Sequence, residues 1–242
     1  MKKTICFDFG NTRLKYAVFE NDIFDKEYIL QNSSPEAIEE ILNTVKPQHS
    51  VLSSVINHDP KIENILASKT KFHKLTHQSK LNFTTPISKP DTIGTDRLAL
   101  TAAAAFFHPN KNNLVIGLGS CITYNFLNQN REFLGGAISP GMGMRFKSMN
   151  DYTAKLPVVN PEWHFPVLGY DTKTNLQSGV IAGITYELNG FIEYYSNRYA
   201  NLDIVITGGN AEYFAKHLKN KLVADTIFLF KGLYAVSELN NH

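Results

Sequence analysis

The sequence predicts an α/β fold made of two similar halves, and three observations indicate it. Residues 5–19 form an apolar strand-like run, a turn of small polar residues and a second strand-like run. Residues 114–127 repeat that design weakly, with Leu118-Gly119-Ser120 where Phe9-Gly10-Asn11 stand in the first half. Each half then continues with a third strand-like run and with helices. Two such halves indicate a duplicated domain with a cleft between them.

Strands and helices of the first half follow from local patterns. Ser34 and Pro35 predict a helix start, because serine caps helices well and proline suits the first turn. The Ala- and Leu-rich run Thr95–Phe107 predicts a second helix. The other expected elements are strands at Thr4–Phe9, Arg13–Glu20, Ile23–Leu30 and Ser50–Ile56, a short helix near Pro60–Ser68, a solvated stretch at Lys69–Lys80 and a long loop at Lys80–Ile93.

The second half begins after His108–Asn113, which ends the preceding helix and marks a domain boundary. We therefore expect two domains, residues 1–110 and 111–242. Within the second, the patterns predict strands at Leu114–Leu127 and Glu132–Ile138, a long helix at Val180–Tyr199, and a strand, Gly-Gly turn and helix over Leu202–Lys219.

Composition narrows the class of protein. The formal net charge is +2, from 24 basic and 22 acidic residues, which gives no electrostatic case for nucleic acid or a membrane surface. Cys6 and Cys121 lie in apolar runs without metal-ligand spacing, as expected for buried reduced thiols. Asp8 interrupts the first apolar stretch, so no signal peptide forms, and no window is long enough to span a membrane. We expect a soluble cytoplasmic protein.

Asp8 is the first candidate functional residue, because a carboxylate at the end of a buried strand is costly unless it is paired or bound to metal. The turn Gly10-Asn11-Thr12 offers N–H groups and short side-chain donors that can cradle phosphate oxygens. The carboxylate beside it can hold Mg²⁺, directly or through water. The alternative is a tight hairpin in which Asp8 bonds its own turn.

Two further segments support a phosphate site. The second-half turn at Ser120 repeats the first, and a phosphate held from two domains needs two such turns. Gly208-Gly209 lies between a strand and a helix, where backbone can approach a nucleotide closely, although such a pair can also be a simple turn. Asp96 and Arg97 begin the helix that follows the long loop. They are either ordinary helix-start charges or groups that face the cleft.

Taken in order, these motifs resemble those of the type III pantothenate kinases, in the acetate/sugar kinase–heat-shock-chaperone–actin superfamily. The resemblance covers essentially the whole chain. It rests on DFGNTRLK, GTDR, GLGSCIT, GGAISPGM, TKTNLQSGVIAG, ITGGN and FLFKGLYAV. It implies a duplicated ribonuclease-H-like (actin-like ATPase) fold, a homodimer, and phosphorylation of the primary hydroxyl of pantothenate by ATP, the first step of coenzyme A synthesis.

The resemblance also implies roles for individual residues. Asp96 falls at the position of the general base, and Asp8 at the Mg²⁺ site. Substrate-binding positions are Gly94, Thr95, Asp96, Arg97 and Thr172, with Thr174 an alternative to Thr172. Nucleotide-binding positions are Asp8, Gly10, Asn11, Thr12, Arg13, Lys15 and Ser120.

Three positions depart from the family pattern. Gly117 stands where the family usually has an Asp that binds a monovalent cation such as K⁺ or NH₄⁺, so we predict weak or no K⁺ activation. Asn210 replaces an Asp of the Gly-Gly motif, and Ile87 replaces a Tyr on the substrate side. Another small-alcohol kinase of this superfamily, or a non-catalytic nucleotide-binding accessory factor in transcription, is the alternative. A regulator needs neither Asp8 nor Asp96, and the near-neutral charge argues against DNA binding.

Overall fold

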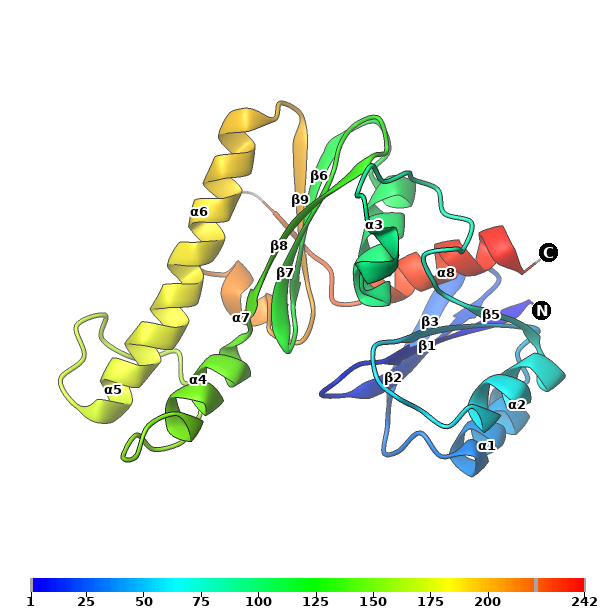
Figure 1. Ribbon diagram of the computed structural model, residues 1–242, viewed down its shortest axis with the longest axis horizontal. Helices are drawn as coiled ribbons and strands as arrows, with labels where there is room; N and C mark the ends of the chain where they lie inside the picture. The colour runs from blue at the N-terminus through cyan, green and yellow to red at the C-terminus, as the bar shows by residue number, and fades with distance from the viewer. Residues whose placement is uncertain (1, 220–221, 242) are drawn as a thin grey trace. The chain divides into compact units, whose positions relative to one another are not determined.

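A computed structural model describes residues 2–219 and 222–241 (Figure 1). The chain forms two compact units, each assembled from separate segments of the sequence. The first comprises Met1–Lys111, Asn125–Gly135 and Ile227–His242, and the second Asn112–Tyr124 and Gly136–Thr226. Along the described chain no helix combines the length and the apolar character needed to cross a membrane.

A mixed five-stranded sheet carries the first half of the sequence, in the order β3-β2-β1-β4-β5. Strands β1, β2 and β3 pair antiparallel, whereas β4 and β5 run parallel to β1. The strands are β1 (Lys3–Phe9), β2 (Leu14–Glu20), β3 (Ile23–Leu30), β4 (His49–Ser54) and β5 (Lys71–Lys74). The stretch Lys69–Lys80, predicted to be solvated, contains β5, which the prediction lacked; this strand forms one edge of the sheet and leaves Lys71 and Lys74 exposed.

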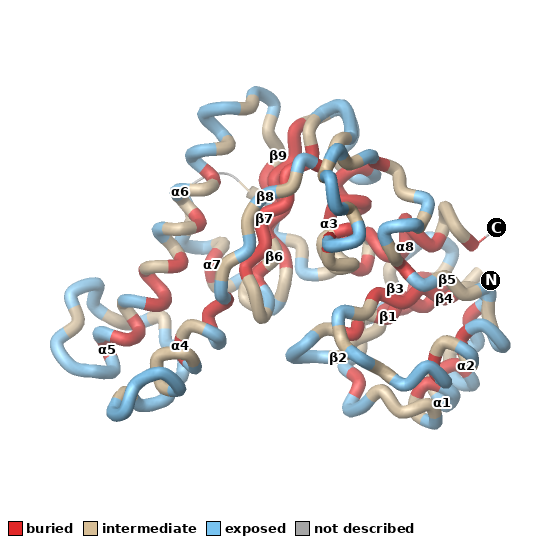
Figure 2. The backbone as a smooth tube through the Cα atoms, in the orientation of Figure 1, coloured by how far each residue is buried: buried red, intermediate tan, exposed pale blue. Residues whose placement is uncertain are grey.

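The second sheet repeats this design, in the order β10-β9-β6-β7-β8. In both sheets the first strand lies between the second and the fourth, and the third and fifth form the edges. Its strands are β6 (Asn112–Leu118), β7 (Cys121–Leu127), β8 (Phe133–Pro140), β9 (Leu202–Thr207) and β10 (Val223–Ala224). Figure 2 shows burial concentrated on β1, β4, β6, β7 and β9, which are all inner strands of the two sheets. The predicted duplication is confirmed.

One face of the first sheet packs on two helices, α1 (Pro35–Val45) and α2 (Lys61–Lys69). Ser34 caps α1 as predicted, because its Oγ accepts the Ala37 N–H at 3.2 Å. The apolar side chains of this face alternate along the strands and form one core: Ile5, Phe7, Phe9, Val18, Leu30, Ile38, Leu42, Leu52, Ile62 and Leu66.

Helices α3 (Thr95–Phe107) and α8 (Phe228–Asn240) pack side by side in the first unit (Figure 1), and α8 also contacts β1 and β4. Small side chains allow a close approach of the two helices. A Cβ added at Gly232 would lie only 1.9 Å from the Ala99 carbonyl oxygen. Because backbone meets backbone here, the position of α3 and of its first turn depends on glycine at 232.

The second unit packs α6 (Gly183–Arg198) on its sheet with a core that includes Leu114, Tyr124 and Ile184. The helix predicted at Val180–Tyr199 is one turn of π-helix, Ser178–Ala182, followed by α6. Gly179 lies in the π turn and Gly183 begins α6, so the one-residue insertion falls at the glycine-containing start of the helix. The remaining elements are α4 (Met142–Asp151), α5 (Thr172–Gln177), α7 (Ala211–Ala215) and, in the first unit, a 3₁₀ turn at Pro90–Thr92.

Candidate active site

Asp8 lies one residue before the end of β1, on the face opposite the α1–α2 core. It pairs with Lys15 of β2 and with Ser53 of β4, so these three side chains share one face of the sheet. The Gly10 N–H donates to the Arg13 carbonyl oxygen at 3.2 Å and closes the hairpin turn. A Cβ added at Gly10 would lie 4.0 Å from Oδ2 of Asp8, so the carboxylate stands beside this turn, as predicted.

The electrostatics of Asp8 favour a bound cation. Burial and, after it, the nearby negative charge of Asp96 together raise the pKa of Asp8 to about 7. Lys15 lowers this pKa only in part, because its ammonium group forms an ion pair with Glu27. Within the described residues no hydrogen bond reaches the Asp8 carboxylate, so the alternative of an Asp bonded to its own turn finds no support. A buried carboxylate with an acidic neighbour and no donor fits a divalent cation.

Asp96 lies in the first turn of α3, in the same unit as Asp8. Gly94 precedes the helix, and a Cβ there would lie 2.5 Å from Oδ1 of Asp96. Glycine at 94 therefore leaves room for the Asp96 carboxyl group in this position, and a larger residue would require that side chain to move. Burial raises the pKa of Asp96, and the N–H and the charge of Arg97 oppose that rise without cancelling it. Asp8 and Asp96 are thus two partly buried carboxyl groups, and the charge of Asp96 raises the pKa of Asp8.

Arg97 is held by two side chains that the sequence patterns did not identify. Its Nε donates to Oδ1 of buried Asn125 at 2.7 Å, and its Cζ lies 5.5 Å from the ring centre of Phe133. The amide orients the guanidinium group without adding a negative charge, and the ring supports its flat face. An Asn inside the apolar strand β7 was the available signal for this contact.

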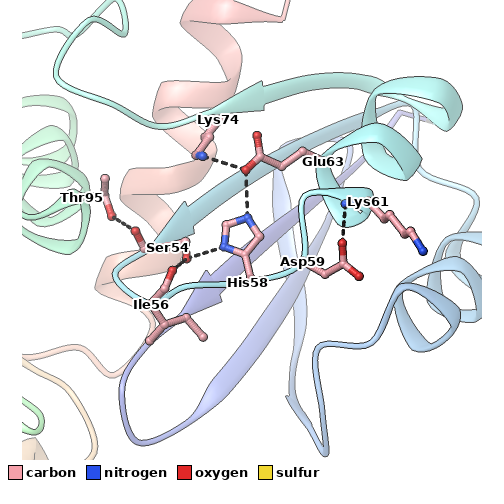
Figure 3. A network of polar contacts seen from close by, with 8 residues as sticks. All are labelled: Ser54, Ile56, His58, Asp59, Lys61, Glu63, Lys74 and Thr95. Carbon is pink, nitrogen blue, oxygen red and sulfur yellow. Dashed lines mark hydrogen bonds and ion pairs between the residues drawn. The ribbon is translucent and has the colours of Figure 1, made fainter.

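A polar network ties down the loop after β4 (Figure 3). The Nδ1 atom of His58 lies 2.9 Å from Ser54 Oγ, and its Nε2 lies 2.9 Å from Oε1 of Glu63. Lys74 donates to the same oxygen at 2.7 Å. Burial raises the pKa of Glu63, but hydrogen bonds from Lys74 and His58 outweigh it and lower that pKa overall. The Oγ1 of Thr95 reaches the Ser54 carbonyl oxygen at 3.4 Å, so α3 begins against this loop.

In the second unit, Gly141 packs against the backbone of the turn that contains Ser120. The Gly119 N–H donates to the Cys121 carbonyl at 3.0 Å, and the Gly141 N–H donates to the Ser120 carbonyl at 3.0 Å. A Cβ at Gly141 would lie 2.3 Å from the Gly119 oxygen. The GGAISPGM motif therefore ends against the β6–β7 turn, where only a glycine fits.

The Gly208-Gly209 turn joins the same end of the second sheet. Gly208 has φ +97°, and a Cβ there would lie 2.6 Å from the Leu118 carbonyl oxygen. The Asn210 N–H donates to that oxygen at 3.3 Å. Thr207, which pairs with Gly117, is buried, and its hydroxyl has no partner in the part of the chain that the structure describes. The motifs GLGSCIT, GGAISPGM and ITGGN thus meet at the same end of the second sheet.

Thr172 and Thr174 have different surroundings. The Thr174 hydroxyl belongs to the capping box of α5, because it donates to Oδ1 of Asp171 at 2.7 Å and accepts the Asp171 N–H at 3.1 Å. Thr172 is the first residue of α5 and is exposed. Of the two candidates, Thr172 is the one whose side chain faces solvent.

The predicted residues fall into two groups. The first unit holds Asp8, Gly10, Asn11, Thr12, Arg13, Lys15, Gly94, Thr95, Asp96 and Arg97, and the second holds Ser120 and Thr172. Asn11, Thr12 and Arg13 form the exposed tip of the first turn. Lys15 points its ammonium group to Glu27. Ile87 packs beside Gly135, 3.7 Å from a Cβ placed there.

Comparison with known proteins assigns the chain to a family. The family model described as type III pantothenate kinase matches residues 4–194. Curated type III pantothenate kinases from Christiangramia forsetii and Flavobacterium johnsoniae are both 38% identical to this chain. The first alignment covers 98% of each chain and the second 93%.

Solved structures share the fold. A Campylobacter jejuni protein assigned to the Baf family of transcriptional activators superposes with a TM-score of 0.61 at 22% identity, over 97% of each chain. Component A of the (R)-2-hydroxyglutaryl-CoA dehydratase of Acidaminococcus fermentans superposes with a TM-score of 0.50 at 12% identity. That match covers 100% of this chain and 98% of the other. These likenesses support the duplicated ribonuclease-H-like fold that the sequence predicts. The family model and the full-length relatives place this chain in the type III pantothenate kinase family.

Proposed function

We propose that this chain transfers the γ-phosphoryl group of ATP to the primary hydroxyl of pantothenate, the first step of coenzyme A synthesis. The observation that carries the proposal is the pair of partly buried carboxyl groups with raised pKa values, Asp8 near the end of β1 and Asp96 at the start of α3. Phosphoryl transfer needs one group to hold the metal and another to receive the proton. The first unit supplies both, on a chain of the pantothenate kinase family.

Asp96 is the proposed general base, which accepts the proton of the substrate hydroxyl as the oxygen attacks phosphorus. A carboxylate whose pKa lies above its ordinary value is a stronger base, and general bases contribute about 10²–10⁴-fold to rates. Asp8 would hold Mg²⁺, which neutralises charge on the phosphates. The turn over residues 10–13, Lys15 and Ser120 would bind the nucleotide.

Arg97 is the proposed anchor for an anionic group of the substrate. Its guanidinium group can bind either the pantothenate carboxylate or the transferring phosphate by two parallel hydrogen bonds. Asn125 and Phe133 already orient it, which lowers the entropy lost on binding. Gly94, Thr95 and Thr172 complete the proposed substrate contacts.

A monovalent cation is not part of the proposed site. Gly117 offers no side-chain oxygen on β6, and Asn210 uses its N–H to hold the turn on Leu118. We therefore propose weak or no activation by K⁺ or NH₄⁺.

We also propose a homodimer, with residues 1–110 and 111–242 as the two ribonuclease-H-like repeats of each copy. The second unit exposes several large apolar side chains, which supports an interface on that unit: Ile138, Met144, Tyr152, Leu168, Tyr186 and Tyr194. A cytoplasmic location stays a prediction from composition.

The test is phosphorylation of pantothenate by the purified protein with ATP and Mg²⁺, in K⁺ and in Na⁺ buffers. Equal turnover in both supports the kinase and the loss of the cation site at Gly117. Turnover in K⁺ alone keeps the kinase and overturns the cation proposal. Absence of turnover in both buffers overturns pantothenate as substrate, and it favours another small alcohol or a non-catalytic nucleotide-binding role.

A further inference from the structure

Ser53 is a buried hydroxyl on the same face of the sheet as Asp8. It lies on β4, directly across from Asp8 in the parallel β1–β4 register, and none of its surface is exposed. Its Oγ lies 2.9 Å from the Oγ1 of Thr95, the first residue of α3. One hydrogen bond therefore connects the strand next to Asp8 with the helix turn that carries Asp96.

The position of the Asp96 carboxyl group depends on this hydrogen bond between Ser53 and Thr95. Thr95 precedes Asp96 directly, and Gly94 before it has no side chain with which to anchor the turn. The Thr95 hydroxyl also donates to the Ser54 carbonyl oxygen at 3.4 Å (Figure 3), which is a longer bond. The Ser53 hydroxyl makes the shorter one.

We propose that Ser53 is a positioning residue of the active site, whose hydroxyl holds the first turn of α3 so that the Asp96 carboxyl stays beside Asp8. Ser53 acts through Thr95 and does not touch substrate. The catalytic consequence rests on the proposed kinase function, because it assumes that Asp96 is the general base. Misplacement of a base by about 1 Å can slow a reaction by as much as about 10²-fold.

The same strand offers a matched control. Ser50 is also fully buried on β4, and its Oγ lies 2.6 Å from the Oγ1 of Thr70 at the end of α2. The two pairs have the same chemistry, a serine hydroxyl of β4 bonded to a threonine hydroxyl at a helix end. They differ in that only the Ser53 pair adjoins Asp96. Loss of either hydroxyl leaves a threonine without that partner, so the effects on stability should be similar.

The experiment compares Ser53→Ala, Ser53→Cys and Ser50→Ala with the unchanged chain. For both Ser53 variants we expect kcat to fall about tenfold with KM for ATP within about twofold, because a thiol is a weak hydrogen-bonding group. Ser50→Ala should keep the full kcat. Ser53→Ala should have no further effect in a Thr95→Val background, since the bond is already lost there. Hydrogen exchange of residues 94–98 should quicken in the Ser53 variants alone.

Each outcome decides the proposal. Equal kcat and equal exchange at residues 94–98 in Ser53→Ala and Ser50→Ala would overturn it while the kinase function stands. An additive effect of Ser53→Ala on Thr95→Val would also overturn it, because Ser53 would then act by another route. If the unchanged chain fails to phosphorylate pantothenate, the proposed function falls, and the exchange measurement alone decides whether Ser53 holds the first turn of α3.

Discussion

The two sheets share one strand order but carry different chemistry at matching positions. Asp8 stands two residues before the turn glycine of the first sheet, and Gly117 stands two residues before that of the second. Their neighbours on the fourth strand of each sheet are Ser53 and Thr207. The Ser53 hydroxyl is bonded to Thr95, whereas that of Thr207 has no partner among residues 2–219 and 222–241.

The two sheets therefore share one backbone design, whereas only the first has a carboxyl group at this matching position. The first unit has two partly buried carboxyl groups, and the charge of Asp96 raises the pKa of Asp8, which is costly without a bound cation. The second unit has neutral turns in which backbone atoms pack so closely that Gly141 and Gly208 leave no room for a side chain. We infer that the charged groups of the proposed reaction belong to the first unit.

The largest expected effect contrasts Asp8→Asn beside the first turn with Ser120→Ala in the second. Asp8→Asn keeps the shape but removes the charge that would hold Mg²⁺, so kcat/KM should fall about 10²–10³-fold, as on loss of one preorganised electrostatic group. Ser120→Ala removes one neutral hydroxyl and should cost at most about tenfold. Steady-state kinetics with ATP and pantothenate measure both. Equal losses would contradict the division of charge between the units.

A smaller effect contrasts the packing of helices in the two units. Gly232→Ala places a methyl group against the Ala99 backbone and should destabilise the first unit by about 1–3 kcal/mol. Gly190→Ala in α6 of the second unit meets nothing within 4 Å, so it should stabilise by up to about 1 kcal/mol through helix propensity. Urea denaturation of both variants gives the comparison. A stabilising Gly232→Ala would show that α3 and α8 are not in backbone contact.

The smallest effect concerns acid stability of the second unit. Glu187 accepts hydrogen bonds from Tyr124 at 2.9 Å and Ser139 at 2.5 Å and pairs with Arg145. Burial raises the pKa of Glu187, but the bonds from Arg145, Ser139 and Tyr124 outweigh it, so the folded-state pKa is lowered. Its stabilisation is therefore present above the unfolded pKa and is lost as pH falls through the folded value.

Glu187→Gln should lower the free energy of unfolding at pH 7 by about 0.5–1 kcal/mol, because solvent screens the partly exposed ion pair with Arg145 and the Gln oxygen can still accept hydrogen bonds. The variant should also lose less stability than the unchanged chain between pH 6 and pH 3. Urea denaturation across that range measures this, with the exposed Glu193→Gln on the same helix as control. Parallel curves for all three proteins would rule out a role for Glu187 in acid sensitivity.

Local signals in the sequence predicted most of the framework. Strand patterns, the Ser34 cap and the weak repeat between residues 5–19 and 114–127 gave the duplicated α/β design, because each depends on neighbouring residues. Asp8 stood out as a charge inside an apolar run. Its position beside the Gly10 turn and its coupling to Asp96 agree with that expectation.

Contacts between segments that are distant in the sequence could not be predicted from local patterns. Strand β5 has only four residues, and two of them are lysines, so it lacks the apolar pattern by which a strand is predicted. Arg97 meets Asn125 across 28 residues, and Ser53 meets Thr95 across 42. No local periodicity encodes such pairs, because they depend on which strands and helices the fold brings together. The π-turn at Ser178–Ala182 was missed for a similar reason, since a one-residue insertion leaves the helical pattern almost unchanged.

The central claim is that Asp96 receives the proton of the pantothenate hydroxyl in an ATP-dependent transfer. Its most direct test is the rate of phosphopantothenate formation by the unchanged chain and by Asp96→Asn, followed by mass spectrometry at saturating ATP and Mg²⁺. The account predicts product from the unchanged chain and a loss of about 10²–10⁴-fold in the variant, with ATP binding retained. Product formed by Asp96→Asn at the rate of the unchanged chain would contradict it.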